Sequence, residues 1–408
     1  MKKTIIAVLM TLICAALFAQ NAASDFEISE RGTITKYKGW DSAVVIPETI
    51  NGVRVTAIGN GAFASNDLTS VTIPNGVTGI GDEAFSGNKL TSVTIPASVT
   101  YIGQNAFGGN QLTSVTIPGN GVTINSRAFN NNKLTSVTIP GNEAFIDGTQ
   151  AFANNPITSI TLGKNHVLST DILSNNRSLY YDYACNDRKA GTYTANRAVA
   201  AEKTEGDFKY IETQYGAFIT KYTGNAGNRL EIPSRLGGIS VKAIRGFSGI
   251  SRVRIPDSVT YIGDGAFKGN QLTEITIPNN VNYIGNEAFS GNKLTSVTIP
   301  DSVIFIGNNA FFRNQLASVT IGSGVTYIGA GVFSRNELTS VTIPDNTFIG
   351  QNAFSNNRLT SVTIGSGVIA HSRPFDAAGG FEKIYDANGR TAATYTRLDT
   401  ESTNWTKQ

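Results

Sequence analysis

Histidine and cysteine are almost absent from this sequence, with two residues of each among 408, and charged residues make up only 15%. So few histidines and cysteines exclude a Cys/His zinc cluster and a disulfide-stapled scaffold. Lys and Arg number 33 against 30 Asp and Glu, so no basic excess is available to neutralise nucleic-acid phosphates. A hydrophobic content of 40% is too high for a disordered chain, so we expect packed domains.

The N-terminus has the pattern of a secretory signal. Lys2 and Lys3 precede a charge-free run over Thr4–Phe18, which is shorter than the ~20 apolar residues that a spanning helix needs. We predict a signal peptide over 1–19, export of the chain, and no transmembrane segment in the mature protein. A membrane anchor and a lipoprotein anchored through Cys14 are the alternatives. A signal peptide directs export across one membrane only. It therefore does not tell whether the protein is secreted, held at the outer cell surface or kept in the periplasm.

A repeat dominates the rest of the chain. The string Leu-Thr-Ser-Val-Thr-Ile-Pro begins at Leu68 and recurs every 22 residues as far as Leu134, and a second run extends from Ile250 to Leu359. The segments that open and close the two runs also match, so the halves are internal copies. We predict a first array with caps at 20–194, a linker at 195–206, a second array with caps at 207–397, and a flexible tail at 398–408.

Each repeat has a segment that favours an extended strand. Leu68, Val71 and Ile73 are apolar, Thr and Ser lie between them, and Pro74 ends the strand because it lacks an N–H. One repeat cannot bury its apolar side chains alone, so stacked coils are expected, with identical residues in columns. The predicted phenylalanine columns are Phe63, Phe85, Phe107 and Phe129 in the first array, and Phe267, Phe289, Phe311, Phe333 and Phe354 in the second.

An asparagine recurs two residues before the strand leucine, as at Asn88 and Asn110. We expect its amide to pair backbone groups of a turn that would otherwise be buried without partners. The full unit, Leu-Thr-Ser-Val-Thr-Ile-Pro-x-x-Val-Thr-x-Ile-Gly-x-x-Ala-Phe-x-x-Asn, resembles the BspA-like leucine-rich-repeat family of bacterial surface proteins, known especially from treponemes and oral bacteria.

The resemblance implies a fold and a role. The fold is a mainly β, right-handed leucine-rich-repeat solenoid in two tandem arrays of ~22-residue coils. One parallel sheet would follow a concave face, with short strands or helical turns on the other side. The role is that of an adhesin, which attaches to host matrix or plasma proteins such as fibronectin and fibrinogen, or to other bacteria in coaggregation. The partners are therefore expected to be proteins.

The outward residues of the strands are the candidate binding surface, because alternate side chains of a strand face opposite ways. They form rows of hydroxyl groups: Ser70, Thr72, Ser92, Thr94, Ser114, Thr116, Ser136, Thr138, Ser296, Thr298, Ser318, Thr320, Ser340 and Thr342. Three interpretations are open: a protein-binding face, a merely soluble face with binding at loops or termini, and a carbohydrate- or ice-binding lattice. The second-ranked function is thus a secreted carbohydrate-binding or structural lattice protein without a protein partner.

Two strands break these rows with Arg252 and Arg254 in one coil and Glu274 and Thr276 in the next. We predict that this patch is a hot spot for a partner, because arginine is favoured at interfaces. A simple surface Arg–Glu pair, which stabilises little, is an equally open interpretation.

Nothing in the sequence supports catalysis. The only imidazoles, His166 and His371, do not align when the copies are superposed, and no carboxylate pair recurs on a strand face. No glycine-rich loop follows a strand and opens a helix, so the glycines are assigned to turns. Cys185 aligns with Ala387 of the other copy, so the fold does not require it. We predict a protein that is not an enzyme, with no catalytic residues, no metal site and no cofactor.

Overall fold

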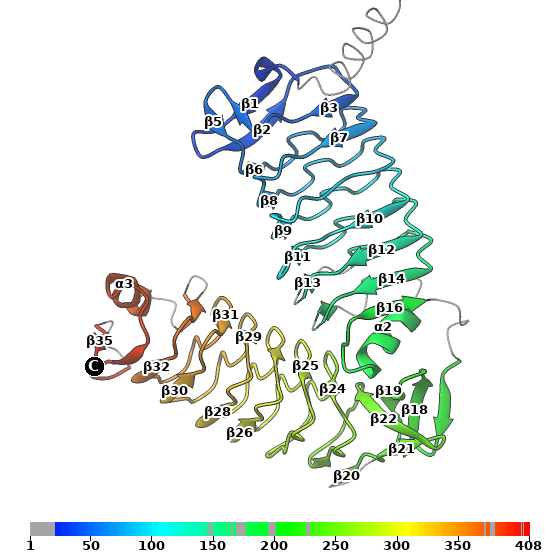
Figure 1. Cartoon of the computed structure of the whole chain (residues 1–408). Helices are drawn as coiled ribbons and strands as arrows, with labels where there is room; N and C mark the ends of the chain where they lie inside the picture. Colours follow the sequence, from blue (N-terminus) through cyan, green and yellow to red (C-terminus); the bar gives the residue numbers. More distant parts are fainter. Residues whose placement is uncertain are drawn as a thin grey trace, which may run out of the picture. The chain divides into compact units, whose positions relative to one another are not determined.

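The computed structural model describes residues 21–142, 144–146, 150–164, 166–168, 177–194, 201–225, 229–370, 373–375, 380–400, 402 and 404–408. The predicted signal peptide over 1–19 lies outside these residues. Contacts divide the chain into two compact units, one of residues 1–183 and 188–199 and the other of residues 184–187 and 200–408. Each unit is a stack of short and mostly parallel strands (Figure 1). The predicted mainly β leucine-rich-repeat solenoid is confirmed.

Helix is scarce in the part of the chain that the structure describes. It is limited to the 3-10 turn η1 (Ala23–Asp25) and the α-helices α2 (Arg177–Cys185) and α3 (Gly380–Ala387). Neither α-helix has the length and apolar character needed to cross a lipid bilayer.

The longest sheets lie on one side of the coils; they begin with strands of three to six residues and continue with two-residue strands. The sheet of the first unit contains, in order, β1 (Phe26–Ile28), β2 (Thr33–Tyr37), β6 (Ala57–Ile58), β8 (Gly79–Ile80), β9 (Tyr101–Ile102), β11 (Thr123–Ile124), β13 (Phe145–Ile146) and β15 (Val167–Leu168). That of the second unit contains β17 (Lys203–Glu205), β18 (Phe208–Glu212), β19 (Ala217–Tyr222), β22 (Ile239–Ile244), β24 (Tyr261–Ile262), β25 (Tyr283–Ile284), β27 (Phe305–Ile306), β29 (Tyr327–Ile328), β31 (Phe348–Ile349) and β33 (Ile369–Ala370).

The Ser-Val-Thr segments, together with the irregular strands that pair in line with them, form a second set of strands, which we call the hydroxyl face. In the first unit these are β3 (Ala43–Val45) with β7 (Ser70–Thr72), and β10 (Ser114–Thr116), β12 (Ser136–Ile139), β14 (Ser159–Leu162) and β16 (Gly191–Thr194). In the second unit they are β20 (Leu230–Glu231) with β23 (Val253–Arg254), β26 (Ser296–Ile299) with β28 (Ser318–Ile321), and β30 (Ser340–Ile343), β32 (Ser361–Ile364), β34 (Ala393–Thr396) and β35 (Thr406–Lys407). Two small hairpin pairs join β4 (Thr49–Ile50) to β5 (Val53–Arg54), and β21 (Arg235–Leu236) to β22.

The expectation of a single continuous sheet on the hydroxyl face is therefore wrong. That face is interrupted, whereas the side expected to hold only short strands or turns carries the continuous ladder. Close approach of neighbouring coils explains the ladder: the Gly103 N–H donates to the carbonyl of Ile80 at 2.8 Å. A Cβ at Gly103 would lie 2.5 Å from the backbone nitrogen of Asp82, so glycine allows this spacing without a shift.

Identical apolar side chains stack through the core, as predicted. Ring centroids of successive phenylalanines from Phe63 to Phe129 lie 5.0, 5.2 and 5.1 Å apart, with nearly parallel planes. The column from Phe267 to Phe354 repeats this arrangement with spacings of 5.2 to 5.4 Å. These side chains are completely buried, so each ring removes apolar area from water on both of its faces.

The buried asparagines form the predicted ladder between coils. The Nδ2 of Asn110 donates to the carbonyls of Phe85 at 2.9 Å and Phe107 at 3.1 Å, and its Oδ1 accepts from the N–H of Leu90 at 3.1 Å. Asn292 makes the same three bonds in the second unit. Each amide therefore ties a turn to the coil before it, which satisfies buried backbone groups.

Segments that follow the last coil close each strand stack. β16 pairs antiparallel with β14, and β34 pairs antiparallel with β32. Tyr183 and Tyr193 are buried beneath the first closing segment with their rings edge to face, 5.3 Å apart. The end of the apolar column is thereby covered instead of exposed.

The C-terminal residues differ from the flexible tail predicted at 398–408. β35 pairs antiparallel with β34, and Trp405 is only 4% exposed. Its ring lies 5.3 Å from that of Phe381, and the Arg397 guanidinium lies 4.9 Å above it. The tail prediction is wrong for Trp405–Gln408 because burial of a large aromatic side chain holds this strand in place.

The predicted linker at 195–206 is described only from residue 201 onwards. Lys203–Glu205 of this segment form β17, which pairs antiparallel with β18. These residues belong to the long sheet of the second unit. Lys203–Glu205 are therefore part of that unit and not of a linker.

Candidate functional site

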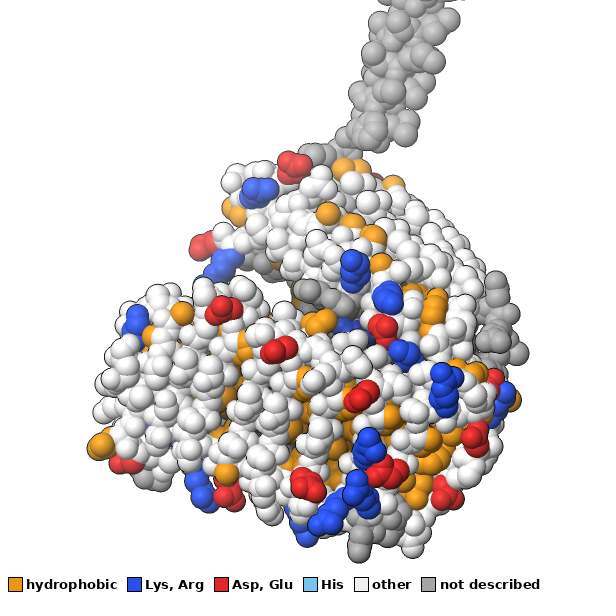
Figure 2. Space-filling model, turned by 60° about the horizontal axis from the view of Figure 1, so that its bottom comes forward, with side chains coloured by type: hydrophobic (Ala, Val, Ile, Leu, Met, Phe, Trp, Pro, Cys, Tyr) orange, Lys and Arg blue, Asp and Glu red, His pale blue; other side chains and the backbone are white. Residues whose placement is uncertain are grey.

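The predicted Ser and Thr residues lie on the surface in register from coil to coil. Ser114 lies opposite Ser136, and Ser296 lies opposite Ser318. Most are exposed, while Ser136 and Thr138 are half-buried. Polar side chains and backbone dominate the visible surface, with charges of both signs interspersed (Figure 2). The exposed members are Ser70, Thr72, Ser92, Thr94, Ser114, Thr116, Thr276, Ser296, Thr298, Ser318, Thr320, Ser340 and Thr342.

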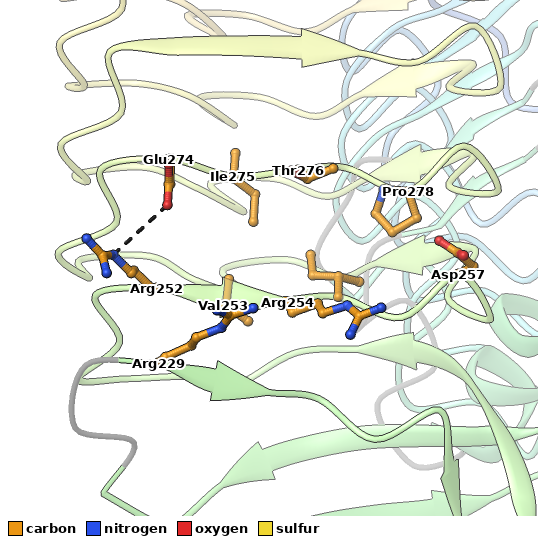
Figure 3. Close-up of a pocket in the computed structure, with 10 residues that line it drawn as sticks. Arg229, Arg252, Val253, Arg254, Asp257, Glu274, Ile275, Thr276 and Pro278 are labelled. Atoms are coloured by element: carbon orange, nitrogen blue, oxygen red, sulfur yellow. Dashed lines mark ion pairs between the residues drawn. The ribbon is translucent and has the colours of Figure 1, made fainter.

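The hydroxyl face is interrupted at the predicted arginine patch. β23 pairs with β20 on one side, and among the described residues no strand pairing joins β23 to Glu274–Thr276. Val253 and Ile275 are only half-buried here, whereas Val297 in the next coil is 4% exposed. A pocket of about 430 Å³ opens between these two coils (Figure 3). We call it the arginine pocket; it is lined by Arg229, Arg252, Val253, Arg254, Ile255, Asp257, Glu274, Ile275, Thr276 and Pro278.

Exposed ion pairs cross the arginine pocket. The Arg252 Nε lies 4.0 Å from the Glu274 Oε1, at one end of the pocket (Figure 3). Both side chains are more than half exposed, at 63% and 79%, so the pair contributes little to stability and is easily exchanged for a ligand. The prediction that Arg252 and Glu274 lie side by side on adjacent coils is therefore confirmed.

Arg254 has a partner that the sequence did not indicate. Its Nη1 lies 3.7 Å from the Oε2 of Glu231, whose other oxygen accepts a 2.9 Å hydrogen bond from the Arg229 Nε. Parallel pairing of β20 with β23 places Glu231 opposite Arg254. Asp257 lines the opposite end of the pocket from Arg252. The coil that contains Glu231 departs from the repeat consensus, so the sequence alone does not show that Glu231 aligns with Arg254.

The arginine pocket suits recognition of polar or charged groups. Guanidinium and carboxylate groups surround a half-buried apolar floor of Val253 and Ile275, and no imidazole lines the cavity. Within the described ranges, no group of three or more His, Cys, Asp or Glu side chains is arranged to hold a metal ion. The arrangement offers electrostatic and apolar contacts to a ligand, with no positioned acid and base.

His166 is a structural residue of the first unit. It is completely buried; its Nδ1 accepts from the Ala144 N–H at 3.0 Å, and its Nε2 lies 3.1 Å from the Ile139 carbonyl. The Tyr183 hydroxyl accepts a 2.7 Å hydrogen bond from the His166 backbone N–H. Both ring nitrogens are thus used by backbone groups, which assigns the neutral ring with its proton on Nε2. His371 lies outside the described residues, and Cys185 is buried in α2.

Acid should destabilise the first unit through His166. Burial, helped by the nearby Arg188 cation, lowers the pKa of His166 from 6.5 to about 4. The unfolded chain therefore binds a proton first, so this stability is complete above pH 6.5 and is lost towards pH 4, by about 3 kcal/mol in all. We expect the free energy of unfolding of the wild type to fall over this range by more than that of His166→Gln. Parallel curves for the two proteins would contradict this.

Stacked coils, a buried asparagine ladder and columns of Leu and Phe define this chain as a leucine-rich-repeat protein. A family model described as the BspA type leucine rich repeat region matches six copies, over residues 56–180 and 260–372. These segments cover more than half of the sequence, and the chain belongs to this family. A comparison with curated proteins gives no match.

Several solved bacterial structures are similar to the chain. A leucine rich cell surface protein from Faecalibacterium prausnitzii is 20% identical, with 85% of this chain and 92% of that one covered and a TM-score of 0.28. A leucine-rich repeat protein from Eubacterium ventriosum is 21% identical, with 81% and 91% covered and a TM-score of 0.25. A leucine rich repeat protein from T. pallidum is 17% identical, with 83% and 89% covered and a TM-score of 0.23. These values are too low to bear on the position of any site.

Proposed function

We propose that this chain is an exported bacterial repeat protein that binds other macromolecules at the cell surface, as an adhesin does, and performs no chemistry. The observation that carries the proposal is the arginine pocket. Exposed, weakly paired charges and half-buried apolar side chains meet there, at one of the breaks in the hydroxyl face. This combination is typical of an interface centre, where arginine and apolar anchors dominate binding energy.

Two further features support the proposal. The charge-free run over Thr4–Phe18 after Lys2 and Lys3 supports export. Membership of the BspA-type family and the broad surface of a solenoid support a partner that is a protein. The interruptions of the hydroxyl face do not favour a regular carbohydrate or ice lattice, because such a lattice needs evenly spaced rows across many strands.

Replacing Arg252 and Arg254 with Ser should weaken binding to the partner at least tenfold, because the anchor charges of the pocket are removed. The measurement is surface plasmon resonance of the mature chain against immobilised fibronectin, fibrinogen and whole bacterial cells. Small hydroxyl residues hold the equivalent strand positions in the regular coils, as Ser296 and Thr298 do, so the fold should be retained. Arg358→Ser removes an exposed arginine elsewhere in the array and should leave binding unchanged. Equal binding by R252S/R254S and wild type would reject the pocket as the site.

A further inference from the structure

A second group of arginines lies away from the arginine pocket, at the turn that follows the phenylalanine column. The guanidinium carbons of Arg313 and Arg335 lie 5.1 and 5.7 Å from the ring centroid of Phe312. Phe312 is half-buried and both arginines are exposed. The backbone N–H of Arg313 donates to the Ser334 carbonyl at 3.1 Å, so the two arginines belong to directly adjacent coils. We call these three residues the arginine clamp.

The arginine clamp holds two like charges side by side without a carboxylate. In the part of the chain that the structure describes, neither guanidinium forms an ion pair or a side-chain hydrogen bond. The nearest acidic residue along the chain, Glu337, is engaged by Arg358 at 3.6 Å. This contrasts with the arginine pocket, where Arg229, Arg252 and Arg254 all face carboxylates. Like charges held together and unneutralised favour the binding of an anion.

Both arginines also hold a backbone position that the neighbouring coils fill with a different type of residue. Arg313 and Arg335 have φ of 54° and 59°, in the left-handed region that favours glycine and asparagine. Gly291 in the coil before and Asn356 in the coil after hold the same position, with φ of 68° and 54°. The arginines are thus kept at positions where a smaller residue fits the backbone better, which points to a use other than folding.

We propose that the arginine clamp binds a carboxylate of an acidic protein segment. The two guanidinium groups donate hydrogen bonds to the oxygens of a carboxylate, while the exposed part of the half-buried Phe312 ring receives an apolar neighbour of the acidic residue. A sulfated polysaccharide would need cationic groups to continue along the array edge. The equivalent positions on either side are instead the uncharged Gly291 and Asn356. The site is distinct from the arginine pocket, and its test does not need the partner of the proposed function.

The probe is an acetylated Glu-Leu-Glu tripeptide amide, with the neutral Gln-Leu-Gln amide as its control, titrated onto the mature chain by peptide-observed NMR. We expect the acidic peptide alone to bind, and its affinity to fall at least tenfold in R313N/R335N. Arg127→Asn, which removes an exposed arginine of the first unit with a similar φ of 57°, should change nothing. Unchanged affinity in R313N/R335N would overturn the proposal. So would tighter, arginine-dependent binding of a heparin-derived oligosaccharide, which would assign the clamp to polyanions.

Thermal unfolding of the same variant is a second test. Asparagine suits the left-handed backbone and removes the repulsion between the two guanidinium groups, so R313N/R335N should unfold at the wild-type temperature or above it. A clear fall in the unfolding midpoint would show that the arginines serve to cover Phe312, and would overturn the inference that they are kept for binding.

Discussion

Replacing Asn110 with Ala should destabilise the first unit by about 3–5 kcal/mol, which is a large share of the stability of a typical domain. The Asn110 amide bonds the carbonyls of Phe85 and Phe107 and the N–H of Leu90, and these groups lie in the interior. Alanine leaves three backbone groups without partners, each at a cost of about 1–3 kcal/mol.

Asn66 offers a matched control for this change. It occupies the same repeat position at the start of the first array, but it is half-buried and its Nδ2 donates one bond, to the Ala64 carbonyl at 2.9 Å. Asn66→Ala should therefore cost less than about 1 kcal/mol. Urea denaturation followed by circular dichroism compares the two variants with wild type. If Asn110→Ala lowered the free energy of unfolding no more than Asn66→Ala, hydrogen bonding to buried backbone groups would not explain why asparagine recurs at this position.

The repetitive part of the fold could be predicted because every coil repeats the same chemistry. A side chain that recurs every 22 residues must stack on its copies, so the phenylalanine columns and the asparagine ladder followed from spacing alone. The same logic placed Arg252 beside Glu274, because they hold the same position in adjacent coils. Residues at the same position of successive regular repeats can therefore be predicted from the sequence to be neighbours in the solenoid.

Departures from the repeat could not be predicted in this way. Only two residues per coil form the continuous ladder, which is too short a segment for alternation of polar and apolar residues to be visible. Glu231 lies in a degenerate coil, so its pairing with Arg254 depends on a register that the sequence does not reveal. Trp405 follows the last coil and has no counterpart in the repeat, so its burial depends on how the closing segment folds back.

Phe107→Ala should destabilise the first unit by about 3–5 kcal/mol. The ring is completely buried and stacks on Phe85 at 5.2 Å and Phe129 at 5.1 Å, so its removal opens a cavity between two coils. The rigid backbone ladder on one side of the coil prevents the neighbours from closing this space. Tyr101→Ala removes an aromatic residue of the same coil that is 43% exposed, and it should cost about 1 kcal/mol or less.

Double variants test whether the stack is a chain of nearest-neighbour contacts. Phe107→Ala and Phe129→Ala share a ring–ring contact, so the second change should cost less once the first is made. Phe107→Ala and Phe289→Ala lie in different units and share no ring contact, so their effects on the separate unfolding transitions should add. Additivity of the first pair would mean that each phenylalanine is stabilised by its own coil, and that stacking along the column contributes little.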